Sequence, residues 1–129
     1  MTDELESLVV SGKDINRKLV ADILAPYLRL DKDVCNIRPV GGWDALKAYQ
    51  KILLYLLSRK AMVALEFGIP AEGATAGEVA KDTGLKTGTV NPALRELLDD
   101  DRLIDQGEDS RYFIPNHAIE RVKTMLSKK

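Results

Sequence analysis

The sequence is poor in the residues from which many active sites and disulfide-bonded folds are built. It contains one cysteine, Cys35, and one histidine, His117. No intrachain disulfide can form, and we expect the Cys35 thiol to act as a small buried hydrophobic group in a reducing compartment. A single histidine gives a histidine-based triad only one candidate, and no glycine-rich phosphate loop or cysteine-based metal site is present. We therefore expect no enzymatic activity, no metal and no cofactor.

Long hydrophobic runs are also missing. The longest uninterrupted one, residues 52–57, is far shorter than the roughly 20 residues that a membrane-spanning helix needs. The first ten residues are acidic, whereas a signal peptide begins with basic residues. These features, together with the single cysteine, predict a cytoplasmic protein with no membrane association.

What is present is the composition of a soluble globular chain. Hydrophobic residues make up 45% of the 129 residues, and 19 lysines and arginines nearly balance 20 aspartates and glutamates. A chain of this length can bury a hydrophobic core without a disulfide or a metal, and its near-neutral charge identifies no partner. We divide it into an N-terminal helical segment, residues 1–43, and a main domain, residues 44–129.

The N-terminal segment has the pattern of one amphipathic helix. Residues 11–14 have the spacing of a helix cap, and apolar residues then recur at every fourth position, at Ile15, Leu19, Ile23 and Tyr27. Pro26 should end this helix. The following residues, 31–42, are rich in turn formers, and we expect only a brief extended piece at 34–38.

A second and longer helix is predicted at residues 45–67, with Asp44 as its cap. No proline or glycine interrupts it before Gly68, and apolar residues cover most of its circumference. A helix that is apolar nearly all round is buried on several sides. Its charged residues should mark the part that faces solvent, and these are Lys47, Lys51, Arg59 and Lys60.

Two shorter helices are predicted next, joined by a glycine turn. Thr75 and Glu78 have the spacing of a capping box, which starts a helix, and Gly84 is well placed as its left-handed stop. A new helical pattern follows with Val90, Leu94, Leu97 and Leu98. Because a proline in mid-helix clashes with the carbonyl four residues earlier, we expect this helix to begin near Thr89, with Pro92 in its first turn.

The spacing of Ala80, Gly84 and Val90 resembles the signature of the helix-turn-helix superfamily. An ordinary helical hairpin is the alternative. Residues 102–114 alternate apolar and polar side chains around Gly107, which predicts a β-hairpin that resembles the wing of winged helix proteins. The resemblance covers residues 45–114 and implies a mainly α (α+β) winged helix-turn-helix fold with a long buried first helix and extra terminal helices.

A last helix is predicted after Pro115, with Asn116 as its cap. It places Ile119, Val122 and Leu126 on one face. Because winged helix dimers often pair through terminal helices, the resemblance suggests a homodimer. The alternative is that this face covers the core of its own domain.

The resemblance also implies a DNA-binding surface, in which the second helix of the motif enters the major groove. The positions carried over are Lys86, Thr87, Thr89, Asn91 and Arg95, with Arg111 on the wing. Asn91 and Arg95 can pair with adenine and guanine edges, whereas Lys86 and the two threonines suit phosphate oxygens.

Charge is the main argument against DNA. Residues 75–114 carry five basic and nine acidic side chains, a net charge of −4, although phosphate neutralisation provides most non-specific affinity. Residues 99–101 should lie at the far end of the helix, but Glu108 and Asp109 lie at the wing tip. The sequence therefore favours a DNA-binding transcriptional regulator, with a winged helix that binds another protein as the alternative and RNA binding as a lesser one.

Overall fold

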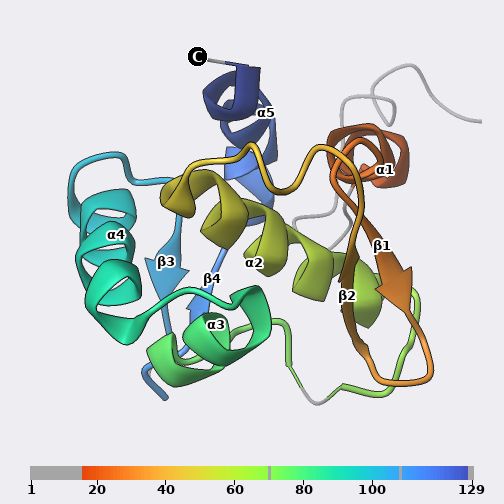
Figure 1. The fold of residues 1–129 in the computed structure, drawn as a ribbon, viewed down its shortest axis with the longest axis horizontal. Coiled ribbons are helices and arrows are strands. Elements are labelled where there is room, and N and C mark those ends of the chain that lie inside the picture. The colour runs from red at the N-terminus through yellow and green to blue at the C-terminus, as the bar shows by residue number, and fades with distance from the viewer. Residues whose placement is uncertain (1–15, 70, 108, 128–129) are drawn as a thin grey trace, which may run out of the picture.

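The computed structural model describes residues 16–69, 71–107 and 109–127, which form a mixed α+β fold (Figure 1). In these ranges the elements are α1 (Arg17–Leu24), β1 (Leu28–Asp31), β2 (Asn36–Pro39), α2 (Ala48–Ala64), α3 (Ala76–Thr83), α4 (Thr87–Asp99), β3 (Asp105–Gln106), β4 (Tyr112–Phe113), the 3₁₀ turn η2 (Asn116–Ala118) and α5 (Ile119–Ser127). β1 pairs with β2 and β3 pairs with β4, both antiparallel.

Helix α2 passes through the middle of the molecule and contacts α1, α3, α4 and α5 (Figure 1). Every residue from 52 to 62 is buried. This confirms the prediction of a helix buried on several sides. One hydrophobic core surrounds α2, and residues 20–43 contribute to it together with the rest of the chain.

The predicted ends of α2 were wrong by a few residues. The helix begins at Ala48, where the Lys47 backbone N–H donates to the Gln50 side chain over 2.8 Å, so Asp44 is not its cap. It ends at Ala64, and Glu66 then has a φ of 60°. The chain therefore leaves the helix direction before Phe67, and neither a glycine nor a proline ends the helix.

Two of the charges expected in solvent are buried, which is a second correction. Arg59 and Lys60 are 8% and 5% exposed. The loop after α2 folds back over them. Arg59 donates to the backbone oxygens of Ala71 and Glu72, at 2.9 and 3.0 Å. Lys60 Nζ lies 2.8 Å from Glu72 Oε2. Because both cations have oxygen partners in that loop, burial leaves neither of them unpaired.

The N-terminal part holds a hairpin that the sequence pattern did not predict. Helix α1 ends before Pro26, as expected, and its N-cap is Asn16, whose side chain accepts from the Leu19 N–H. The cap expected at residues 11–14, and Ile15, lie outside the described residues. Strands β1 and β2 flank a turn in which the Asp31 carboxylate accepts the Asp33 and Val34 N–H groups. An extended piece was expected at residues 34–38. Only its part from Asn36 onward belongs to a strand, which is β2.

The C-terminal part contains the predicted hairpin and last helix. Tyr112 of β4 also exchanges two backbone hydrogen bonds with Ala74, of 2.8 and 2.9 Å, which attaches the β3–β4 hairpin to the start of α3. Ile119 and Val122 are buried in this chain's own core. The alternative for the α5 face is thus confirmed, and that face no longer supports a dimer. Asn116 lies in the 3₁₀ turn before α5, and its Oδ1 accepts from Lys60 Nζ at 2.5 Å, which joins this turn to α2.

No helix in the described ranges combines the length and the apolar character needed to cross a bilayer.

Candidate nucleic-acid interface

Helices α3 and α4 are joined by the predicted glycine turn. Thr75 Oγ1 accepts the Glu78 N–H at 3.2 Å, and Glu78 Oε1 accepts the Thr75 N–H at 3.1 Å, so the capping box is confirmed. Gly84 ends α3 with a φ of 77°, a left-handed conformation that glycine adopts without a Cβ clash. Local sequence signals therefore determine both ends of α3.

The two helices pack on each other and on α2 through their apolar faces. Val79 of α3 and Val90, Leu94 and Leu97 of α4 are buried. Ala80 is half-buried against this core. This packing fixes the orientation of α4 and leaves its opposite face to solvent.

The exposed face of α4 carries the residues predicted to contact DNA. Lys86, Thr87, Thr89, Asn91 and Arg95 are all exposed. Thr87, Asn91 and Arg95 are four residues apart and so form one stripe along the helix, whereas Thr89 lies on the other side of the exposed face. The structure thus brings five of the six predicted residues together on one element.

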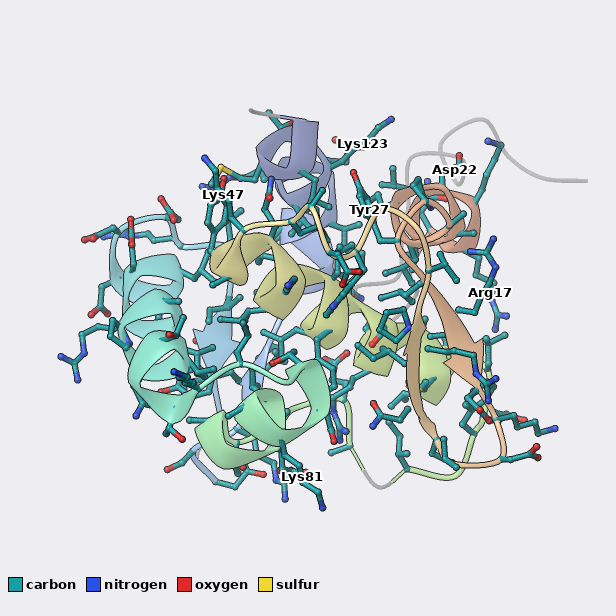
Figure 2. The ribbon with its side chains drawn as sticks, viewed as in Figure 1. Arg17, Asp22, Tyr27, Lys47, Lys81 and Lys123 are labelled. Atoms are coloured by element: carbon teal, nitrogen blue, oxygen red, sulfur yellow. The ribbon has the colours of Figure 1, made fainter. Side chains whose placement is uncertain are left out.

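Acidic residues occupy only the other end of α4. None occurs from Lys86 to Arg95, and Glu96, Asp99, Asp100 and Asp101 follow. At 1.5 Å per residue, Asp99 lies about 18 Å along the axis from Thr87, and about 6 Å from Arg95, one turn further along the same stripe. On the neighbouring helix α3, Lys81 is exposed (Figure 2). The N-terminal half of α4 is therefore the non-acidic part of an otherwise acidic region.

Arg111, the sixth predicted residue, is engaged within the protein. Its Nη1 donates to Glu78 Oε1 at 2.6 Å and to the Gly73 carbonyl at 3.2 Å, and its Nε lies 3.5 Å from Asp109 Oδ2. A Cβ at position 73 would lie 2.8 Å from the Arg111 Cβ, so this close approach requires glycine. Arg111 thus holds the β3–β4 hairpin against α3, with its charge neutralised.

The Arg111 pair also affects the titration of Glu78. Partial burial alone would raise the pKa of this carboxyl group, but hydrogen bonding with Thr75 and the positive charge of Arg111 outweigh it. The pKa of Glu78 is consequently lowered from its usual value. Glu78 is therefore a carboxylate at neutral pH, and it joins the capping box to the hairpin.

Pro92 does not delay the start of α4, which corrects the prediction. The helix begins at Thr87, and Pro92 is its sixth residue. Because the N–H groups of Thr89 and Val90 both donate to the Lys86 carbonyl, at 2.9 and 3.0 Å, the first turn closes ahead of the proline. The exposed face of α4 is thus longer than a helix starting at Thr89 would provide.

A polar cluster behind α3 was not found by sequence reasoning. The Asp82 carboxylate accepts from the Tyr55 hydroxyl at 2.5 Å and from the Asn36 side chain at 3.2 Å, which connects α3 to α2 and β2. Burial, and then the Asp82 carboxylate, raise the pKa of Tyr55 well above its ordinary value. The three residues are far apart in the sequence, and no local pattern indicates that they meet.

No protein-family model, curated protein or solved structure matches this chain. Among the residues that the structure describes, no group of three or more histidine, cysteine, aspartate or glutamate side chains is placed to hold a metal ion.

Proposed function

We propose that this protein binds duplex DNA through α4 as a winged helix-turn-helix transcriptional regulator in the cytoplasm. The observation that carries the proposal is the exposed, acid-free stretch from Lys86 to Arg95, which is oriented by a half-buried capping box, an exposed glycine turn and an apolar core. An α-helix fits the major groove of B-DNA, where the base edges present distinguishable hydrogen-bonding patterns.

The exposed residues divide into two roles. Asn91 and Arg95 lie one turn apart on the same stripe, and their side chains can form paired hydrogen bonds with adenine and guanine edges. Lys86, Thr87 and Thr89 lie at or near the start of the helix, where they suit phosphate oxygens. Lys81 of α3 adds a further cation for the backbone.

Arg111 is left out of the DNA contacts in this proposal. Its guanidinium is paired with Glu78 and Asp109, so contact with phosphate would require breaking those pairs. The hairpin then acts as a support for α3 instead of a minor-groove element. With few cations available, we expect a shallow dependence of affinity on salt, with a log–log slope of about −2 to −5.

The test is selection of a preferred duplex from a random pool, followed by fluorescence anisotropy. Arg95→Ala should weaken the selected duplex by about 1–3 kcal/mol and relax preference at one base pair. Lys86→Ala should weaken all duplexes alike. Lys18→Ala is the matched control, because Lys18 is an exposed cation on α1, paired with Asp22, and lies outside this surface. If the folded protein retains no duplex at low salt, the proposal is wrong.

A homodimer would place two such helices on adjacent half-sites, and it stays a prediction. Ile119 and Val122 are buried within one chain, whereas Leu126, the third residue of that α5 face, is half-buried. Light scattering at micromolar concentration measures the mass directly.

Protein binding is the second candidate, and one observation favours it. A groove of about 230 Å³ between α2, α4 and α5 has an apolar lining that includes Tyr49, Ala93 and Met125, and an acidic rim formed by Glu96 and Asp101. Such a groove fits a basic amphipathic helix. A 14-residue leucine/lysine peptide should then bind the wild-type chain and lose affinity on Glu96→Lys, while a leucine/glutamate peptide should not bind. This result, in a protein that retains no duplex, would favour the second candidate.

A further inference from the structure

The end of α2 that is remote from α4 borders an apolar groove. The groove lies between α1, β1 and the last turn of α2, and its volume is about 240 Å³. Its walls are almost entirely apolar and include Leu30 and Leu65. It is hollow because three lining positions, Ala21, Ala61 and Ala64, have no side chain beyond Cβ. The protein thus leaves unfilled a space that larger side chains would close.

Among the described residues, one charged side chain lines this groove. Arg17, the first residue of α1, is exposed on the side of the molecule away from α4 (Figure 2). Its Nη2 donates to the Ala64 carbonyl at 3.0 Å, which holds the guanidinium beside the groove. Within the described part of the chain, no carboxylate pairs with Arg17. The described residues therefore leave the positive charge of Arg17 without a carboxylate partner.

We propose that this groove binds a small aliphatic carboxylic acid, with its chain against the alanines and its carboxylate on Arg17. Apolar concavities with one or two polar groups are typical small-molecule sites. At roughly 30 Å³ for each water molecule, the groove holds about eight waters, which corresponds to a chain of about six to eight carbons. The cation selects an acid over an amine or an alcohol.

A second copy of the chain fits this groove less well. In a symmetric dimer the same surface faces itself, so a contact centred here would bring the two copies of Arg17 together. Of the described residues that line the groove, none is acidic, so none of them would neutralise that pair. A carboxylate supplies the missing charge. The proposal is independent of DNA binding, because the groove and the exposed face of α4 lie at opposite ends of α2 (Figure 1).

The experiment is calorimetric titration of the full chain with octanoate, hexanoate, octylammonium and 1-octanol. Octanoate should bind about 4–10 times more tightly than hexanoate, since a fully buried methylene contributes about fourfold and a half-enclosed one about two- to threefold. Octylammonium should bind at least tenfold more weakly than octanoate. Arg17→Gln should weaken octanoate about tenfold and leave 1-octanol unchanged. Lys18→Gln, the neighbouring exposed cation, should change neither.

A second pair of variants tests the location. Ala21→Leu should fill the groove from its solvent side and abolish octanoate binding, whereas Ala25→Leu, also exposed on the α1 side but outside the groove, should retain it. The proposal is overturned if the folded wild-type chain does not bind octanoate, or if octylammonium binds as tightly. It is also overturned if the chain is a dimer that Ala21→Leu converts to a monomer, because the groove would then be an interface between copies.

Discussion

Replacing Lys60 by methionine should destabilise the protein far more than replacing an ordinary surface lysine. Lys60 Nζ lies 2.8 Å from Glu72 Oε2 and 2.5 Å from Asn116 Oδ1, and its side chain is 6% exposed. Methionine keeps much of the length and the apolar stem but removes both polar contacts. Glu72 then loses its cation, and Asn116 loses a charged hydrogen-bond donor.

The size of the effect follows from what each partner loses. Removing one member of a buried ion pair costs about 3–5 kcal/mol when the remaining charge stays dry. The Glu72 side chain is 31% exposed, so water replaces part of the lost interaction and we take about half of that cost. With about 1 kcal/mol for the Asn116 hydrogen bond, the total is about 2.5–3.5 kcal/mol. At roughly 3–5 °C per kcal/mol for a chain of this size, Tm should fall by about 8–17 °C.

Urea denaturation of four proteins tests this reasoning: the wild type, Lys60→Met, Glu72→Gln and the double variant. The double variant should recover about 1–2 kcal/mol relative to the sum of the two single changes, because the unpaired carboxylate is gone. Lys81→Met is the matched control, since Lys81 is exposed on α3. If Lys60→Met changes stability by less than about 0.5 kcal/mol, as the control should, Lys60 faces solvent and the reasoning is refuted.

Three further predictions concern the two helices of the candidate interface. Ala80→Leu should cost about 1–3 kcal/mol in thermal melting, because the added volume forces α3 and α4 apart; unchanged melting would mean that Ala80 does not face this contact. Pro92→Ala should stabilise the chain by about 1–2 kcal/mol, because it restores a donor to the sixth position of α4; a loss of stability would place Pro92 outside the helix. Glu78 has a lowered pKa in the folded chain, so its stabilising effect is present above its unfolded-state value of about 4.5 and is lost as pH falls further. The difference in Tm between the wild type and Glu78→Gln should therefore shrink from pH 7 to pH 3, and a constant difference would contradict the role of the Glu78 carboxylate.

The features predicted correctly are those whose causes are local in the sequence. The capping box of Thr75 and Glu78, the left-handed turn at Gly84 and the exposure of Asn91 and Arg95 each depend on residues within about one or two helical turns. The candidate interface on α4 could be predicted for this reason.

The features that were missed depend on contacts between distant segments. Lys60 was expected in solvent because its neighbours give no sign that Glu72 and Asn116 fold over it. Arg111 was expected on DNA, yet its partners include Glu78, 33 positions earlier. Polar residues in one helix pattern look alike whether solvent or a later loop covers them, and only the tertiary structure distinguishes the two.

The central position of α2 determines how the molecule responds to a partner at either end. Its backbone amides from residue 52 to residue 62 are buried among α1, α3, α4 and α5, so hydrogen exchange at these amides requires the whole structure to open. Any ligand that binds only the folded chain raises the free energy of that opening, and so lowers the population of the open state, throughout the molecule. An acid held beside α1 would therefore protect the buried amides of α4, although it touches no residue of that helix.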